Sequence, residues 1–171
     1  MDTFFEQITA IRKTGKTIAA LIGIWLAAFV ICFLLFLFSG YIGAFFFLLI
    51  AGVIYGAFKL SGLLNVEYEY IVTNGTMDID KITNKSSRKR VISLELQSVS
   101  RLERYNPALL NSVNTKEVFI TCNTNDENAY LMVSSIEGKG TKYLVFAPDE
   151  RLRGAIVKFV PKFIANSAFK N

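Results

Sequence analysis

Two long apolar runs dominate the first part of the chain. Residues 17–38 and 41–58 contain no Asp, Glu, Lys, Arg, Asn, Gln or Pro, and only Ser39 and Gly40 separate them. At about 1.5 Å of rise per residue, each run can cross a hydrocarbon core of roughly 30 Å. A backbone in lipid must satisfy its own hydrogen bonds, so each run is predicted to be a helix. Because the joint is short, the helices are antiparallel, and we predict a two-helix transmembrane hairpin over residues 17–60.

The pattern changes to a period of two after Leu64. From Val66 to Val72 the side chains alternate between two faces, which is typical of a β-strand. Asn74-Gly75 then predicts a two-residue hairpin turn, because both central residues of that turn need a positive φ. The predicted strands are residues 66–72, 77–80, 91–96, 99–105, 117–122, 129–134 and 141–147.

The period becomes helical near the end of the chain. Pro148 suits the first turn of a helix, and acidic residues follow it, as the helix dipole favours. Pro161 is expected to end or bend this helix near residue 160. The apolar stripe of the helix is predicted at Leu152, Ile156, Phe159 and Phe163.

These elements predict the architecture of the chain. An N-terminal transmembrane α-helical hairpin is followed by an α+β domain over residues 65–171. In that domain, a seven-stranded antiparallel β-sandwich or barrel is capped by one C-terminal helix at about residues 148–160. Roughly 110 residues are a normal size for one such domain.

Residues 1–16 form an amphipathic segment ahead of the first span. Its apolar residues are Phe4, Phe5, Ile8 and Ile11. This spacing predicts a short helix in the membrane interface. A secretory signal peptide is less favoured, because the apolar run that follows is too long and no clear cleavage site comes after it.

Basic residues flank the two predicted spans on one side only. Arg12, Lys13 and Lys16 precede the first span, Lys59 follows the second, and the joint between the spans is uncharged. Positive residues are retained in the cytoplasm. We therefore expect a multi-pass protein of the plasma membrane, with both termini and the β domain in the cytoplasm.

Small residues recur at helical spacing within the hairpin. They are Ala19, Gly23 and Ala27 in the first span and Gly52 and Gly56 in the second. If the turn is centred between Ser39 and Gly40, Ala27 lies level with Gly52 and Gly23 lies level with Gly56. Small residues allow close backbone contact between helices in lipid. The pattern predicts that the two spans pack through these residues, with homodimerisation as the alternative use.

Three stretches of the chain resemble bacterial pleckstrin-homology-like (PH-like) domains. YIVTNGTMDID (residues 70–80) resembles their opening hairpin, RKRVISLELQSVSRLE (88–103) a basic segment leading into two strands, and FAPDERLRGAI (146–156) their final strand and helix start. The resemblance covers about residues 66–160. With the hairpin, the chain is similar to a family of small bacterial two-span membrane proteins with a PH-like C-terminal domain. The resemblance implies two antiparallel sheets with a helix closing one end.

Composition excludes several classes of chemistry. The chain has no histidine, which removes the usual general base and the commonest zinc ligand. Cys32 lies in a predicted span and Cys122 in the β domain, so no disulfide framework is expected, and Cys122 is interpreted as a buried structural thiol. From Ser61 onward, basic residues exceed acidic residues by only three, which does not suggest nucleic-acid binding. We expect no cofactor and no metal site.

A basic loop and a group of carboxylates are the candidate sites. Lys85, Arg88, Lys89 and Arg90 lie in a predicted loop over residues 84–90, and eukaryotic PH domains bind phosphoinositides with an early basic loop. The alternative is a solvated loop that touches anionic lipid without specificity.

The carboxylates Glu67, Glu69, Asp78 and Asp80 are expected on one face of the first β-hairpin. In principle they suit a divalent cation or acid–base catalysis. The favoured interpretation is that a neighbouring cation, Arg90 among the candidates, neutralises them.

Two functions fit this sequence. The first is a non-enzymatic membrane protein whose PH-like domain binds a protein or peptide at the inner membrane face, through an exposed strand edge, with homo-oligomerisation as one version. The second is a small accessory subunit of a membrane complex such as a transporter, bound through the hairpin. An enzyme acting on lipid ranks last, because neither span contains an ionisable residue.

Overall fold

The computed structural model describes residues 4–111 and 113–169, which form two compact units. One unit holds the described residues up to Ile11, then Glu67–Ile82 and the described residues from Arg88 onward. The other unit holds Arg12–Val66 and Thr83–Ser87. Each unit is described by itself below, as the β unit and the hairpin unit.

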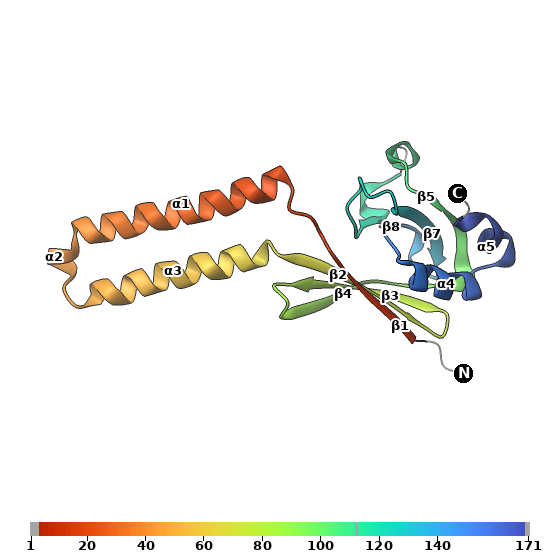
Figure 1. Ribbon diagram of the computed structural model, residues 1–171, viewed down its shortest axis with the longest axis horizontal. Helices are drawn as coiled ribbons and strands as arrows, with labels where there is room; N and C mark the ends of the chain where they lie inside the picture. Colours follow the sequence, from red (N-terminus) through yellow and green to blue (C-terminus); the bar gives the residue numbers. More distant parts are fainter. Residues whose placement is uncertain (1–3, 112, 170–171) are drawn as a thin grey trace. The chain divides into compact units, whose positions relative to one another are not determined.

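The hairpin unit contains two long antiparallel helices (Figure 1). Its elements are α1 (Gly15–Leu37), α2 (Ser39–Ile42) and α3 (Phe45–Leu63). Thr14 caps α1 by accepting a hydrogen bond from the backbone N–H of Thr17 at 3.4 Å. The second helix begins later than predicted because α2 occupies the joint, and Gly43 ends α2 with a φ of 59°. The second long helix therefore covers Phe45–Leu63 rather than 41–58.

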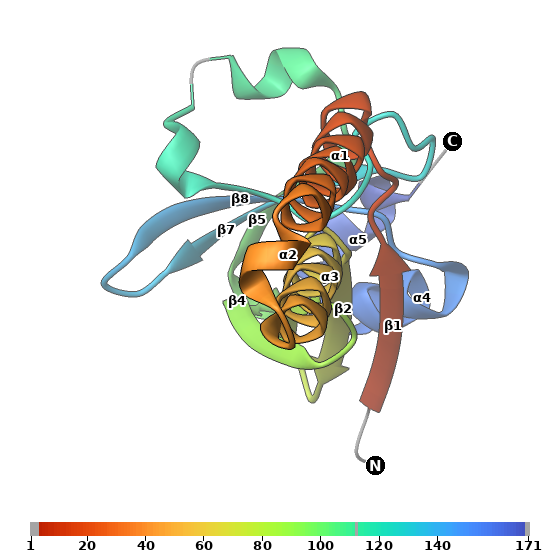
Figure 2. The same ribbon diagram turned by 90° about the vertical axis from the view of Figure 1, so that its left-hand side faces the viewer.

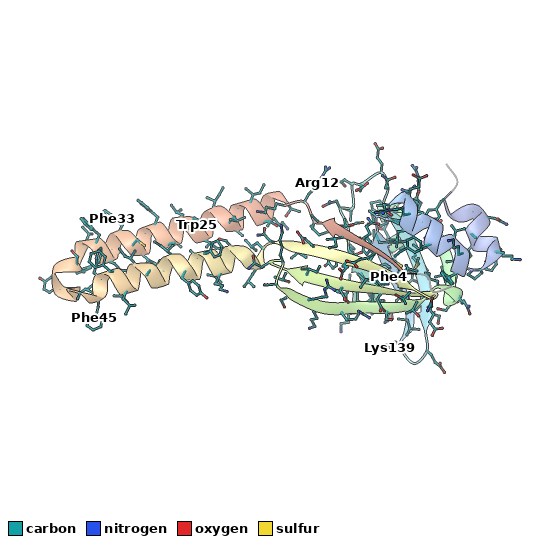
Figure 3. All side chains as sticks on the ribbon, turned by 60° about the horizontal axis from the view of Figure 1, so that its bottom comes forward. Phe4, Arg12, Trp25, Phe33, Phe45 and Lys139 are labelled. Atoms are coloured by element: carbon teal, nitrogen blue, oxygen red, sulfur yellow. The ribbon has the colours of Figure 1, made fainter. Side chains whose placement is uncertain are left out.

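Both long helices present their apolar side chains outward. In Figure 3, Trp25, Phe33 and Phe45 point away from the hairpin, and they are 44%, 54% and 68% exposed. The mean hydropathies of the most apolar stretches of α1 and α3 are 2.9 and 1.8, and only 6% and 11% of those stretches are buried. A core helix of a soluble protein would be mostly buried. By length and composition, both helices could cross a membrane.

The first sheet of the β unit has four strands in the order β1-β2-β3-β4. The strands are β1 (Phe4–Ala10), β2 (Val66–Thr73), β3 (Thr76–Thr83) and β4 (Ser87–Glu95). The turn between β2 and β3 is the predicted two-residue turn, with φ of 47° at Asn74 and 91° at Gly75. Tyr70 and Ile79, predicted to share one face, are both fully buried.

The N-terminal segment is a strand, so the prediction of an interfacial helix was wrong. Residues of β1 pair antiparallel with β2, from Phe4 opposite Thr73 to Ala10 opposite Glu67. Phe5 packs against the hydrophobic core from this strand. The apolar residues of so short a segment fit both the period of a helix and the period of a strand. Backbone pairing with a strand more than fifty residues later selects the strand. The β unit therefore has an eighth strand, which comes before the two long helices in the chain.

The second sheet also has four strands, in the order β5-β7-β8-β6. Figure 2 labels β5, β7 and β8 of this sheet. The strands are β5 (Val99–Arg104), β6 (Val118–Ile120), β7 (Tyr130–Ile136) and β8 (Gly140–Phe146). Short 3-10 helices lie between them: η1 (Leu96–Ser98), η2 (Pro107–Leu110) and η3 (Thr115–Glu117). Because β6 pairs parallel with β8, the domain is not fully antiparallel. Eight strands in two sheets replace the predicted seven.

One hydrophobic core joins the two sheets and the C-terminal helices. Tyr70, Ile79 and Leu94 from the first sheet and Met132 and Phe146 from the second belong to it. A smaller cluster on the opposite face of the second sheet includes Cys122, Leu131, Val145 and, from the loop above, Leu109. Burial of apolar surface from both faces of this sheet stabilises the domain.

Two helices, rather than one, end the chain. They are α4 (Glu150–Phe159) and α5 (Lys162–Ala168). Asp149 caps α4 by accepting a 2.7 Å hydrogen bond from the Leu152 N–H. Pro161 ends α4 as predicted, and a new helix begins after it. The break shifts the apolar stripe, so Ile164 is buried, whereas Phe163 is 73% exposed.

Candidate functional site

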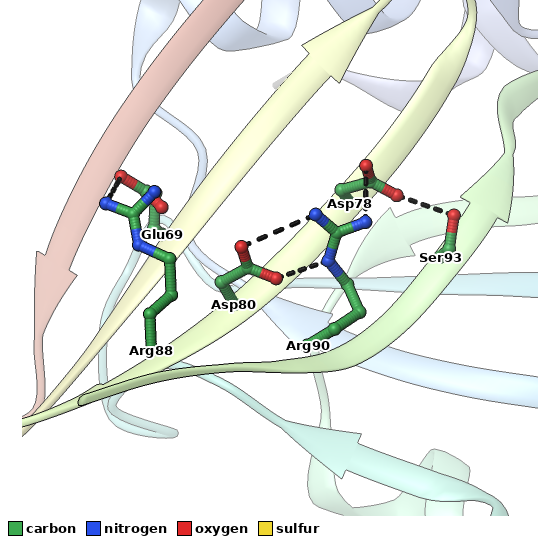
Figure 4. A network of polar contacts seen from close by, with 6 residues as sticks. All are labelled: Glu69, Asp78, Asp80, Arg88, Arg90 and Ser93. Carbon is green, nitrogen blue, oxygen red and sulfur yellow. Dashed lines mark hydrogen bonds and ion pairs between the residues drawn. The ribbon is translucent and has the colours of Figure 1, made fainter.

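Three of the four predicted carboxylates are held by arginines of β4 in two polar groups on the first sheet, which together we call the network (Figure 4). The fourth, Glu67, makes no ion pair with the described residues. Arg88 Nη2 lies 2.9 Å from Glu69 Oε1. Arg90 Nη1 lies 2.6 Å from Asp78 Oδ2, and its Nε donates to Asp80 Oδ1. Ser93 Oγ donates to Asp78 at 2.5 Å. The prediction that Arg90 neutralises the carboxylates is confirmed for Asp78 and Asp80, whereas Arg88 pairs with Glu69.

This network leaves little capacity for a ligand. Asp80 and Glu69 have relative exposures of 5% and 0%, so their charges must be paired to be tolerated. The hydrogen bond to Asp80 raises the pKa of Arg90 above its usual value, so the guanidinium stays charged. Among the described residues, no group of three or more His, Cys, Asp or Glu side chains is placed to hold a metal ion.

Glu69 is the unusual member of the network. Its Oε2 atom is buried and receives no hydrogen bond. Burial raises the pKa of the Glu69 carboxyl, a hydrogen bond with Glu6 raises the pKa further, and the charge of Arg88 opposes both effects. The charges of Glu6 on β1 and Asp80 on β3 also raise this pKa.

We expect Glu69→Gln to remove a pH dependence of the stability of the β unit. Because folding raises the pKa of Glu69, its favourable contribution is present below the pKa of an unfolded Glu and is lost as the pH rises through the folded value. A Gln at this position donates to Glu6 at every pH. The variant should therefore be more stable than the natural chain at alkaline pH and similar to it in mild acid.

Thermal unfolding of the two chains across that pH range checks this expectation. Glu67→Gln is the matched control, because Glu67 lies two residues earlier on β2 and faces Ala10 in the register of β1. Equal pH profiles for Glu69→Gln and the natural chain would contradict the raised pKa of Glu69.

The predicted basic loop is divided between a turn and a strand. The strand β4 begins at Ser87, so Arg88, Lys89 and Arg90 lie in the strand and only Lys85 lies in the turn. Arg88 and Arg90 are held by carboxylates, whereas the side chains of Lys85 and Lys89 are exposed. Contact of these four basic residues with anionic headgroups remains a prediction. Only Lys85 and Lys89 make no ion pair with the described residues, so they are the members of the group that could bind an anion.

Cys122 is a buried thiol, as predicted. Its exposure is 4%, and burial, with a smaller effect of Asp126, raises the pKa of the thiol to about 12. The nucleophilic thiolate is therefore scarce at neutral pH. Tyr70 is similar, because burial raises its pKa to about 12 and its hydroxyl donates to the Thr121 carbonyl at 2.8 Å.

The small residues of the hairpin do not pack as predicted. A Cβ atom added at Gly23, Gly52 or Gly56 would have nothing within 4 Å, so no close backbone contact occurs there. Because α2 occupies the joint, different residues of the two long helices lie opposite each other than was predicted. Ala28 and Ala57 are buried in place of the predicted glycines.

An apolar groove of about 520 Å³ runs between the two long helices. Gly23, Ala27 and Gly56 line it, together with the buried Ala28 and Ala57. The other two predicted packing residues, Ala19 and Gly52, are exposed on their own helices. Three of the predicted residues therefore lie beside the buried pair and line a groove, without the close backbone contact that was predicted.

The residues predicted to set the topology lie together at one end of the hairpin unit. Arg12 and Lys13 precede α1, and Lys16 lies in its first turn. Lys59 lies within the last turns of α3, where its ammonium group is 5.5 Å from the ring centroid of Tyr55. The opposite end, around α2, contains no charged residue.

Gln7 is an important residue that the sequence did not reveal. Its Nε2 donates to the Ala147 carbonyl at 2.9 Å, and its Oε1 accepts from the Asp149 N–H at 2.8 Å. These bonds join β1 to the start of α4, beside which β1 runs in Figure 2. A lone glutamine in an amphipathic segment carries no signal of such a role.

Comparison with known proteins agrees with this arrangement. A family model described as "Bacterial PH-like domain (DUF6106)" matches residues 1–166. The match therefore includes the N-terminal strand and the hairpin as well as the later strands and α4. No curated protein and no solved structure matches the chain.

Proposed function

We propose that this chain, which belongs to the bacterial PH-like domain family, is a non-enzymatic integral membrane protein of the plasma membrane. Its PH-like domain would bind a protein or peptide at the inner membrane face. The observation that carries the proposal is the pairing of β1 with β2 on either side of the hairpin. The two apolar helices are thus an insertion between neighbouring strands of one sheet, and the domain is attached to both of their ends.

The attachment at both ends supports a single location for the domain and the N-terminus. Strands β1 and β2 are hydrogen-bonded neighbours, so both helix ends that lead to them must be on the same side of a membrane. Four basic residues flank that side and the far end is uncharged. By the positive-inside rule, that side is the cytoplasm. Both termini are cytoplasmic in this proposal.

The strand edge offered by β4 is the proposed binding element. In the order β1-β2-β3-β4, one side of β4 has no partner strand among the described residues. It is nine residues long, and its first half is exposed. An extended peptide can add to such an edge through main-chain hydrogen bonds. By contrast, the edge strand β5 of the other sheet is contacted by α5.

The second candidate function, an accessory subunit bound through the hairpin, has its own supporting observation. The groove between α1 and α3 is apolar and lined by small residues such as Gly23 and Gly56. Helices in lipid associate through such surfaces. In this case the hairpin, and not the edge of β4, would carry the specific contact.

Site-specific photocrosslinking in native membranes separates the two functions. A photoreactive residue at Lys89 reports on β4, and one at Phe33 reports on the lipid-facing side of the hairpin. We expect a discrete protein adduct from Lys89 and none from Phe33. A probe at Lys139 in the turn before β8 is the control for random encounters. Adducts from Phe33 alone would favour the accessory subunit and contradict binding at β4.

A further inference from the structure

The net charge of this protein is concentrated in its hairpin unit. The whole chain has a formal net charge of +5. The hairpin unit contains no acidic residue, and its basic residues are Arg12, Lys13, Lys16, Lys59 and Lys85. The rest of the chain is therefore balanced between basic and acidic residues. We call these five residues the basic cluster.

The backbone gathers the basic cluster at one end of the hairpin unit. The helices are antiparallel, so the start of α1 and the end of α3 lie together (Figure 1). Arg12, Lys13 and Lys16 lie at the start of α1, and Lys59 lies near the end of α3. For a hairpin that spans a bilayer, this end lies at the headgroup level.

Lys85 joins the cluster through a turn that is anchored to the end of α3. The N–H of Asn84 donates to the Asn65 carbonyl at 2.9 Å. The Asn84 side chain lies 2.8 Å from the position that a Cβ atom would occupy at Gly62, so only glycine allows this approach. Asn84 and Lys85 adopt φ of 53° and 55°, which fixes the turn in a left-handed conformation. The turn therefore belongs to the hairpin unit, although both its flanking strands continue into the sheet.

The lysines of the cluster are available to a ligand. Within the described part of the chain, Lys13, Lys16, Lys59 and Lys85 make no ion pair. Arg88 and Arg90, which follow Lys85 in sequence, are held by Glu69, Asp78 and Asp80 instead. The structure thus separates basic residues that neutralise carboxylates from basic residues that remain exposed at the hairpin end.

We propose that the basic cluster binds the headgroups of anionic phospholipids in the leaflet next to the β domain, with Lys85 supplied by the β3–β4 turn. This inference rests on the proposed membrane insertion. Its basis is charge complementarity, because the hairpin unit contains no acidic residue and its four lysines are exposed and make no ion pair with the described residues. Each basic residue close to an anionic surface strengthens association by about five-fold. The phosphate of a headgroup accepts hydrogen bonds from several lysines at once.

Fluorescence quenching of the full-length protein tests this proposal directly. Trp25 is the only tryptophan and is exposed on α1. The protein is reconstituted in phosphatidylcholine vesicles that contain phosphatidylglycerol, with bromine on the acyl chains of either one lipid or the other. We expect stronger quenching by brominated phosphatidylglycerol, and a loss of that preference at high salt, where the attraction is screened.

Variants of Lys85 make the test specific. Lys85→Asn removes the charge and suits the left-handed backbone, so the turn should be retained. It should lower the preference for phosphatidylglycerol by up to about five-fold. Lys139→Asn removes the same charge from the β unit and should leave the preference unchanged.

Each outcome decides the inference. Equal quenching by both brominated lipids would overturn headgroup binding while leaving the membrane insertion intact. An equal effect of Lys85→Asn and Lys139→Asn would show that only total charge matters and would overturn the assignment to the turn. No quenching by either lipid would overturn the proposed insertion itself, and the inference with it.

Discussion

Deletion of residues 2–11 is expected to prevent the β domain from folding, although these residues lie before both spans. The deletion removes β1, which pairs along its length with β2. It removes the core contact of Phe5, which is partly buried and contributes about 1–2 kcal/mol. It also removes the two bonds of Gln7 to Ala147 and Asp149, each contributing about 1 kcal/mol. Together with the lost strand pairing, these losses are comparable to the lower end of the stability of a small domain, about 5–15 kcal/mol.

A designed soluble chain provides the matched control. Ala10 lies opposite Glu67, so the register places Ile11 opposite Val66. Replacing residues 12–65 by Asn-Gly should join these two residues with a two-residue turn. We expect this chain to be soluble and to unfold cooperatively, whereas residues 66–171 alone should lack near-ultraviolet circular dichroism. Cooperative unfolding of residues 66–171 with the same midpoint would contradict the role of β1.

Arg90→Met should destabilise the β domain by about 2–3 kcal/mol, because it leaves the carboxylates of Asp78 and Asp80 without their cation. Asp80 is nearly buried, so its charge cannot be hydrated fully. The half-exposed guanidinium reduces the loss below that of a fully buried ion pair. Denaturant unfolding of the natural chain and the variant measures the difference.

Two further variants identify the cause of that loss. Asp80→Asn in the Arg90→Met background should recover part of the stability, because it removes the buried charge. Lys89→Met changes the neighbouring residue of β4, which is exposed, and should change stability by less than about 0.5 kcal/mol. A loss for Lys89→Met as large as that for Arg90→Met would mean that overall charge, and not the network, is responsible.

The local pattern of the sequence was sufficient to predict most helices and strands of this protein. The absence of charge in residues 17–38 and 41–58 predicts helices, because a buried or lipid-facing backbone must bond internally. The Asn74-Gly75 turn follows from backbone preference alone and has the expected positive φ values. The partnership of Arg90 with the carboxylates follows from the cost of like charges that face each other across neighbouring strands.

Length and local composition could not determine which residues of the two long helices lie opposite each other. The prediction placed the turn at Ser39 and Gly40, but residues 39–42 form a helical turn of their own. The shift is small, yet on a helix it changes which side chains face the partner. Ala28 and Ala57 are therefore buried, in place of contacts at Gly23, Gly52 and Gly56.

The hairpin and the strands from Val66 onward were determined by the sequence itself, since long apolar runs and alternating side chains are local signals. The tertiary structure alone decided what the N-terminal segment does. Its pattern fits a helix as well as a strand, and only hydrogen bonds to β2, and the contacts of Gln7 with residues some 140 positions away, select the strand. Such non-local bonds leave no periodic trace in either partner. For that reason the two apolar helices, which resemble an N-terminal anchor in sequence, are in the structure an insertion between two strands of one sheet.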